Sequence, residues 1–514
     1  MGLFSDLMVR LPDKPPGIDE LRERLGYHPP FDAASAQIIR YRKMQGVNLG
    51  SLFCLEPWIS TELYKDYQDQ APEAEGDLLE CMGRESCGSL MEAHWDSWLQ
   101  REDFEKMASI GINTVRLPVG YWVLGTGYAS GKYRRYAHAY NRALHFIGRL
   151  VAWAAEFDIG VLIDVHALPG GQNNDSHSGV TGPPLFYEST ECQELALKVL
   201  ATFASLFGDI TNIAGLQIIN EPLDHPQLEP FYERALELIR SHSAALPVYI
   251  GDAWNLSKYA TITKQLCTRF GFVVLDTHRY WVFRPEEQQH RVDQLTQELW
   301  KNEVPELASA SAEAGGNMII GEYSSVLANR SFDGEDPAEC MGKFACEQLK
   351  AFDQTAAGCF YWTWRLQHDS WFWSMQYAIN TSAMPATYFY FGSDAEMPSE
   401  LRESIATQAE ENRNEWREKH LEGHRNYVSQ WEGEFGFDYY AAGFDQGLDV
   451  ALSFFTKLAF PSKLGFVRQL ASEYASAYVA QNGGEQWKWE FEDGFREANE
   501  EFAGFATGIV RESI

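Results

Sequence analysis

Positive charge is scarce in this chain. Among its 514 residues, Lys and Arg number 42 against 73 Asp and Glu, which gives a formal charge of −31 at pH 7. Binding to a phosphate backbone needs a basic footprint, and an anionic membrane surface would repel an acidic chain. The composition therefore predicts no nucleic-acid partner.

Long hydrophobic runs are absent as well. No uninterrupted apolar run approaches the roughly 20 residues of a membrane-spanning helix. The first residues, MGLFSDLMVRLPDKPPG, are broken by charge and proline before the apolar part of a secretory signal forms. A myristoylation signal at Gly2 would need Ser or Thr where the chain has Asp6. We therefore expect no membrane insertion and a cytoplasmic location.

Cysteine is sparse and has no tight repeated spacing. Of the eight cysteines, Cys81 and Cys87 are close enough in sequence to bridge or to share a metal, but no cluster of His and Cys accompanies them. With no export signal, we expect all eight to be reduced thiols. We also predict that the protein uses no metal or other cofactor.

The chain is rich in aromatic residues and long enough for a large core. Aromatics make up 14% of the residues and include sixteen tryptophans, whereas 45% hydrophobic and 22% charged residues are ordinary for a soluble protein. Such aromatics suit sugar stacking, although most of them will belong to the core. The length fits a barrel of roughly 250 to 400 residues with additions.

Short apolar segments alternate with amphipathic segments between residues 41 and 394. An apolar segment that ends at a breaker indicates a strand buried on both faces, and such strands belong to parallel sheets. Eight of them, mostly separated by helix-sized segments, predict an α/β fold of the (β/α)₈ TIM-barrel type. The predicted strands cover residues 44–50, 112–118, 159–165, 216–220, 247–251, 272–276, 317–321 and 358–363.

Two regions of different composition flank the predicted catalytic barrel. Residues 1–40 carry Pro and charge, and we expect an N-terminal arm that folds across the foot of the barrel. Residues 395–514 have long charged and amphipathic patterns, which predict a helical C-terminal extension. This extension could cover the barrel, pair two subunits or shape the mouth. The sequence does not give the oligomeric state.

Two of the predicted strands end on a glutamate. GLQIINEPL delivers Asn220 and Glu221 to a proline, and NMIIGEY ends on Glu322. In a parallel barrel both strand ends face the mouth, where catalytic residues gather. Two carboxylates there can flank one glycosidic bond, one protonating the leaving oxygen and the other attacking the sugar carbon. The alternative for each is a strand-end carboxylate that pairs with a neighbouring helix.

Seven segments together resemble a known enzyme family. Their order along residues 40–390 is similar to that in the fungal exo-β-1,3-glucanases of glycoside hydrolase family 5. The segments are GVNLGSLFCLEPWI from Gly46, NTVRLPVGYW around Arg116, DVHALPGGQNNDSHSG from Asp164, GLQIINEPL, VVLDTHRYWVF from Val273, IIGEYS from Ile319 and FYWTW from Phe360.

The resemblance implies a role for each residue of the reaction centre. Glu221 would be the general acid and base, with a pKa raised by the nearby anionic Glu322. Glu322 would be the nucleophile of a retaining mechanism. Arg116 would hold Glu322 ionised and oriented, and Tyr280 could donate a second hydrogen bond to it. Asn220 would bond the sugar 2-hydroxyl.

Further residues would bind the sugar. His166 and His278 would bond sugar hydroxyls or the two carboxylates, although a lone histidine is often only structural. Glu56 would bind the outer hydroxyls of the terminal glucose, and Trp362 would lie beneath its ring. Phe283 would form half of an aromatic clamp on the next sugar.

The chain also departs from the family pattern. Asp175 stands where an aromatic would complete the clamp, and Thr277, Arg279 and Trp281 replace other residues of the sixth-strand motif. These replacements would change the part of the site that binds the aglycone, which leaves room for small β-glucosides with apolar aglycones.

The resemblance implies a retaining β-glucosidase or exo-β-1,3-glucanase that acts on β-linked glucosides or glucans. An endo-acting β-glucanase or β-mannanase on the same barrel is an alternative within this class. A non-catalytic carbohydrate-binding or scaffolding protein is an alternative outside it.

Overall fold

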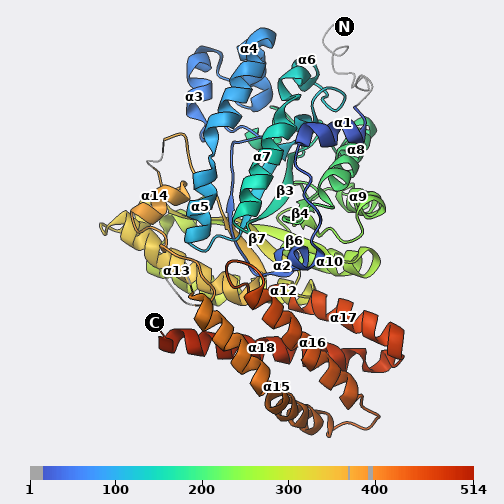
Figure 1. Ribbon diagram of the computed structural model, residues 1–514. Coiled ribbons are helices and arrows are strands. Elements are labelled where there is room, and N and C mark those ends of the chain that lie inside the picture. The colour runs from blue at the N-terminus through green and yellow to red at the C-terminus, as the bar shows by residue number, and fades with distance from the viewer. Residues whose placement is uncertain (1–15, 369–370, 392–396, 514) are drawn as a thin grey trace.

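A computed structural model describes residues 16–368, 371–391 and 397–513 and shows the predicted (β/α)₈ barrel (Figure 1). Its strands are parallel and follow the chain order around a closed barrel, with β8 pairing with β1. The strands are β1 (Met44–Asn48), β2 (Thr114–Gly120), β3 (Gly160–Ala167), β4 (Ile213–Gln217), β5 (Val248–Gly251), β6 (Val273–Trp281), β7 (Met318–Leu327) and β8 (Gly358–Tyr361).

All eight predicted strands are present, and three of them end three or more residues from the predicted position. β4 stops at Gln217, whereas we expected it to reach Asn220. β6 and β7 continue several residues past the predicted ends, to Trp281 and Leu327. Polar residues interrupt the apolar pattern in β6 and β7, so the pattern underestimates their length.

Helices cover the barrel on all sides. The α-helices are α1 (Ile18–Leu25), α2 (Ala33–Tyr41), α3 (Thr61–Tyr64), α4 (Glu75–Trp98), α5 (Arg101–Ser109), α6 (Tyr133–Tyr136), α7 (Ala143–Glu156), α8 (Thr190–Phe207), α9 (Leu228–His242), α10 (Leu256–Phe270), α11 (Val292–Glu298), α12 (Val304–Glu313), α13 (Pro337–Thr355), α14 (Met375–Asn380), α15 (Ser399–Val428), α16 (Phe437–Thr456), α17 (Val467–Asn482) and α18 (Lys488–Ser513). The long first βα loop predicted from the sequence contains α3 and α4, and α4 kinks at Gly83, where φ is +74°.

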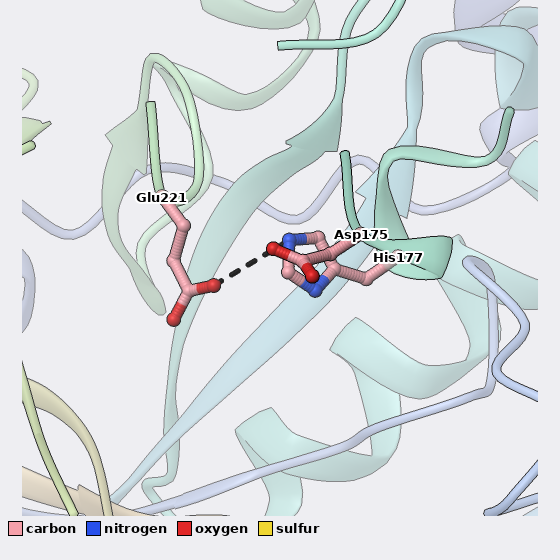
Figure 2. A group of neighbouring side chains, drawn as sticks. All are labelled: Asp175, His177 and Glu221. Carbon is pink, nitrogen blue, oxygen red and sulfur yellow. Dashed lines mark ion pairs between the residues drawn. The ribbon is translucent and has the colours of Figure 1, made fainter. Parts of the chain in front are cut away.

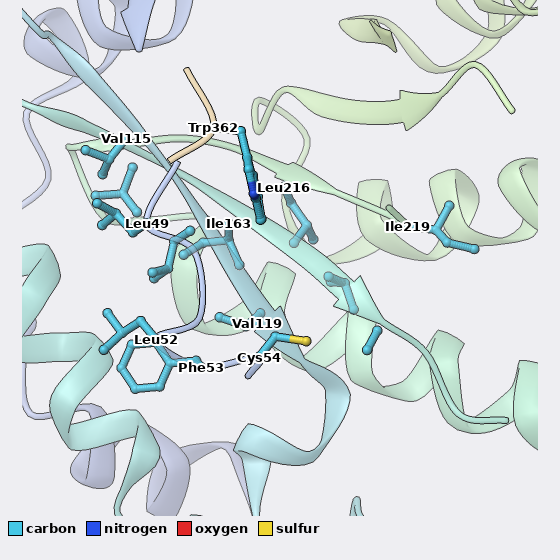
Figure 3. Packing of buried hydrophobic residues seen from close by; sticks show 14 of the residues in the cluster. Leu49, Leu52, Phe53, Cys54, Val115, Val119, Ile163, Leu216, Ile219 and Trp362 are labelled. Atoms are coloured by element: carbon cyan, nitrogen blue, oxygen red, sulfur yellow. The ribbon is translucent and has the colours of Figure 1, made fainter. Parts of the chain in front are cut away.

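The main apolar core lies in and around the barrel. Side chains from the first four strands and the loop after β1 belong to one apolar cluster with Trp362, and Figure 3 shows Val115, Ile163 and Leu216 among them. These three side chains alternate along their strands with Arg116, Asp164 and Gln217, which contact one another inside the barrel. They therefore lie on the outer face of the strands, where packing against the helices holds the strand backbones in place. The polar side chains at the mouth therefore stand on a rigid base.

A second apolar core closes the foot of the barrel. Ile38 and Ile39 of α2 lie there with strand residues such as Ile319 and with Phe454 and Leu470 of the C-terminal helices. The backbone joins the two parts as well, since Lys43 N donates to Lys463 O at 2.7 Å and Gly465 N donates to Tyr41 O at 2.9 Å.

The C-terminal helices α16–α18 thus cover the foot, at the end of the barrel away from α3 and α4 (Figure 1). Of the roles left open by the sequence, the first is the one observed in this chain. A third apolar core, with Trp416, Phe444 and Phe502, lies among α15, α16 and α18. The predicted boundary between residues 394 and 395 lies outside the described residues.

Two expectations from composition can be compared with the structure. Within the described residues, no helix has the length and apolar character needed to cross a membrane. All eight cysteines are free thiols, as predicted.

Candidate active site

Glu322 stands inside β7 rather than at its end. We expected it at the strand tip, but the strand continues for five more residues to Leu327. The register pairs Glu322 with His278 of β6, which brings the two side chains together at the mouth. A Cβ on the preceding Gly321 would lie 2.0 Å from Asp276 Oδ1, so only glycine allows this close packing of β6 on β7.

Both oxygens of Glu322 accept hydrogen bonds. Arg116 Nη1 donates to Oε1 at 2.9 Å, and the Tyr280 hydroxyl donates to Oε2 at 2.7 Å. Both contacts expected from the sequence are therefore present. Burial, together with the charges of Glu322 and Glu221, raises the pKa of Tyr280 well above its ordinary value, so Tyr280 remains a donor. The carboxylate is held on both sides in one orientation.

Arg116 is fully buried beneath the cavity and joins several strands. It donates to Asn48 Oδ1 at 2.9 Å, to Gln217 Oε1 at 2.9 Å and to Asn220 Oδ1 at 2.7 Å. Its Nη2 also lies 3.0 Å from Asp164 Oδ2. Burial alone would lower the pKa of Arg116, but the nearby carboxylates raise it above its ordinary value, so the guanidinium keeps its charge.

Glu221 lies in the turn after β4, four residues beyond Gln217. Its φ is +42°, an uncommon conformation for a residue other than glycine. Asn173 Nδ2 donates to its carbonyl oxygen at 2.9 Å, which ties this turn to the loop after β3. The prediction that Glu221 occupies a strand tip was wrong by these few residues, because the chain leaves the sheet before reaching it.

The pKa of Glu221 also differs from the prediction. We expected repulsion from Glu322 to raise it. Burial does raise it, but the hydrogen bond from His278 Nδ1 to Oε1 at 2.7 Å and the positive charge of that ring lower the pKa of Glu221 to about 2. Burial lowers the pKa of His278, but Glu322 and Asp276 raise it well above its ordinary value. These opposite shifts favour the shared proton on His278.

His166 has a different environment from His278. Its Nδ1 lies 2.6 Å from Asp164 Oδ2, and its Nε2 lies 3.4 Å from Asn220 Nδ2. Burial lowers the pKa of His166, which favours a neutral ring that donates through Nδ1. The ring stacks on Trp362 with centroids 5.6 Å apart. Asn220 is fully buried and is not among the residues that line the cavity, and its contact with a sugar stays a prediction.

Glu56 lies in the loop after β1 at the side of the cavity. Trp58 Nε1 donates to its Oε2 at 2.9 Å, whereas its buried Oε1 has no hydrogen-bond partner among the described residues. Burial raises the pKa of Glu56 to about 7. The loop is fixed by buried Glu75, which accepts a hydrogen bond from Leu55 N at 2.7 Å.

A cavity of about 900 Å³ connects these side chains. Its walls are aromatic in large part, and Phe283 and Trp254 are 63% and 57% exposed. Of the predicted site residues, those that line it are Glu56, His166, Glu221, Tyr280, Phe283, Glu322 and Trp362. Lining residues outside the predicted set include Trp58, His177, Trp254, Trp371 and Trp373.

Only one of the four departures from the family pattern faces this cavity. Asp175 lines it, together with Ser176 and His177. Thr277 instead donates to Asp252 at 2.6 Å, and Trp281 packs against Phe344. Arg279 pairs with Glu303. The expectation that these last three rebuild the aglycone side is therefore wrong, because their side chains point away from the mouth.

A sequence signal was available for two further buried residues of the site that were not predicted, Asp164 and Asp276. Asp164 and His166 on β3, and Asp276 and His278 on β6, are both two residues apart, so each pair lies on one face of its strand. In both pairs the carboxylate contacts the imidazole, at 2.6 Å and 3.3 Å. The repeated Asp-x-His pattern therefore marks buried carboxylates that orient site histidines.

Two groups of side chains could hold a metal ion. One is Asp175, His177 and Glu221, and the other is Glu221, His278 and Glu322; in each, the ligand atoms lie within 4.8 Å of one another. Both contain Glu221, so a bound cation would occupy the carboxylate that an acid needs free. Independence from metals stays a prediction.

Comparison with known proteins identifies the barrel. The model of the cellulase family, glycosyl hydrolase family 5, matches residues 83–367, which is more than half of the chain. The chain belongs to glycoside hydrolase family 5. Residues 409–506 match a separate family, the C-terminal domain of glucan 1,3-beta-glucosidase 3.

Relatives of this family 5 protein extend over both parts. A glucan 1,3-beta-glucosidase 3 from Schizosaccharomyces pombe is 30% identical over 472 residues, covering 89% of this chain and 94% of its own length. An uncharacterized glycosyl hydrolase of Saccharomyces cerevisiae is 26% identical and covers 92% of this chain and 93% of its own length. Among solved structures, that of AoRut has a TM-score of 0.55 at 19% identity, covering 67% of this chain and 98% of that chain, which supports the fold.

Proposed function

We propose that the protein is a retaining β-glucosidase that releases glucose from the non-reducing end of β-glucosides or β-1,3-glucan. The observation that carries the proposal is the separation of the two carboxylates. An oxygen of Glu221 and an oxygen of Glu322 lie within 4.8 Å of each other. Retaining glycosidases place their carboxyl groups roughly 5 to 5.5 Å apart, against roughly 6.5 to 9.5 Å for inverting ones.

In the first step Glu322 attacks the sugar carbon and the bond to the leaving oxygen breaks. Hydrogen bonds from Arg116 and Tyr280 hold both oxygens of Glu322 in one orientation, so little reorganisation precedes the attack. The proton held by His278 Nδ1 moves to Glu221, and Glu221 gives it to the leaving oxygen as the bond to the sugar carbon breaks. Because Glu221 and His278 share that proton, the pair as a whole acts as the acid. In the second step the pair takes a proton from water, which attacks the glycosyl-enzyme and releases glucose with retention.

Glu56 supports removal of a terminal sugar. A buried carboxylate oxygen without a partner is costly unless a ligand supplies a donor, and the hydroxyls of a terminal glucose are suitable donors. The name of the S. pombe relative, glucan 1,3-beta-glucosidase 3, agrees with this substrate class. The eight free thiols support a cytoplasmic location, which we propose as well.

The test is the stereochemistry and size of the first product. Proton NMR of fresh reactions with an aryl β-glucoside should show β-glucose before mutarotation. Laminarin or a shorter β-1,3-glucan should give glucose as its first product. Initial α-glucose would contradict retention, and initial mixed oligosaccharides would favour endo action.

A further inference from the structure

The two oxygens of the Glu221 carboxylate have different surroundings. Oε1 accepts the hydrogen bond from His278 Nδ1 at 2.7 Å. Oε2 accepts no hydrogen bond from the part of the chain that the structure describes, and it faces His177 Nε2 at 3.5 Å. Oε2 is therefore the oxygen open to a ligand. The part of the substrate beyond the cleaved bond must lie against the groups that flank it.

Asp175 and His177 flank that oxygen. Figure 2 shows both side chains reaching toward Glu221 from the loop after β3, and the three residues offer polar atoms within 4.8 Å of one another. Asp175 is exposed, and its carboxylate makes no hydrogen bond or ion pair with any residue described by the structure. Its carboxyl group therefore lies within 4.8 Å of Glu221 with no partner among the described residues.

The loop that carries these side chains is held in place. Asp175 N donates to Asn173 Oδ1 at 3.0 Å, and Asn173 Nδ2 lies 2.9 Å from His177 Nε2. The same amide nitrogen of Asn173 donates to the Glu221 carbonyl at 2.9 Å. Because one asparagine connects the loop to Glu221, the positions of Asp175 and His177 relative to the reacting bond are set by the fold.

Aromatic rings line another part of the same cavity, among them the exposed Trp254 and Phe283. We propose that Asp175 and His177 bind hydroxyl groups of the aglycone and restrict it to a second sugar. This inference rests on the proposed function. A sugar offers hydroxyls to the carboxylate and imidazole and a C–H face to the rings. An apolar aglycone would remove water from the unpaired carboxylate of Asp175 without replacing its hydrogen bonds.

The test compares two substrates that share the same glucose. Values of kcat/KM are measured for laminaribiose, whose aglycone is a sugar, and for octyl β-glucoside, whose aglycone is apolar. The wild-type protein should favour laminaribiose. Asp175→Leu should lower the ratio of laminaribiose to octyl glucoside by about tenfold or more. Asp175→Asn, which still accepts a hydrogen bond, should have an intermediate ratio.

Asp66→Leu is the matched control, because it removes one exposed carboxylate away from the cavity lining and should leave the ratio unchanged. An unchanged ratio in both Asp175 variants, or a wild-type preference for octyl glucoside, would overturn the inference while leaving the glucosidase assignment intact. Hydrolysis of neither substrate by folded wild-type protein would instead overturn the proposed function.

Discussion

The two ends of the barrel use buried charge differently. At the foot, Arg40 Nε donates to Ile213 O at 3.2 Å and Arg42 Nη2 donates to Asp158 O at 2.9 Å, so these guanidinium groups bind backbone carbonyls. At the mouth, the hydrogen-bond partners of Arg116 among the described residues are all side chains, and Glu322 is one of them. Carboxylate oxygens of Glu56 and Glu221 are left open there.

The two ends of the barrel therefore have different roles, stability at the foot and catalysis at the mouth. The foot is closed by α2 and the C-terminal helices over an apolar core, which should contribute stability and no chemistry. The mouth keeps polar groups that a ligand must satisfy. Substitutions at the mouth should therefore change catalysis with little loss of stability, and those at the foot should do the reverse.

The largest effect should come from Glu322→Gln. The amide keeps the shape of the side chain but cannot form the covalent intermediate, so kcat on an aryl β-glucoside should fall by about 10⁴-fold or more. The thermal unfolding midpoint should stay close to that of the wild type. Near-normal turnover would remove Glu322 from the reaction.

His278→Gln should give a smaller effect with a characteristic pH dependence. Since the pKa of His278 is raised, the Glu221–His278 pair holds its proton below that raised pKa and loses it as the pH rises above it. Wild-type kcat/KM should therefore persist above the ordinary histidine range and then fall. In the variant kcat/KM should drop by about 10²-fold, and its alkaline limb should move to lower pH. A limb that does not move would show that His278 shares no proton with Glu221.

Phe454→Ala at the foot should have the smallest effect on catalysis. The side chain is 1% exposed and lies in the core between the barrel and the C-terminal helices. Its truncation should lower the free energy of unfolding by about 3 to 5 kcal/mol, measured by denaturant titration. At a temperature where the variant is folded, kcat should equal that of the wild type. A large loss of kcat would mean that the foot acts on the mouth.

The barrel could be predicted from sequence because its strands are short apolar segments between helical ones. The pairing of Glu221 with Glu322 followed from two such segments that end on a carboxylate. The pKa of Glu221 could not be predicted, because it depends on which atom of His278 reaches it. The contact of His177 with Glu221 also depends on the folding of a loop that has no periodic pattern.

The position of the C-terminal helices could not be predicted from the sequence either, for a different reason. Residues such as Phe454 and Leu470 form an apolar face that must be covered, but an amphipathic pattern does not say what covers it. In the structure, α2 and the strand ends at the foot of the barrel cover this face.

The most direct measurement is the identity of the residue that becomes bound to the sugar. A 2-deoxy-2-fluoro-β-glucoside with a good leaving group should trap the glycosyl-enzyme, and peptide mass spectrometry should locate the added sugar. We predict labelling of Glu322, with protection by glucose. Labelling of any other residue, or rapid hydrolysis of ordinary β-glucosides with inversion and no trapped enzyme, would contradict the assignment of the two carboxylates.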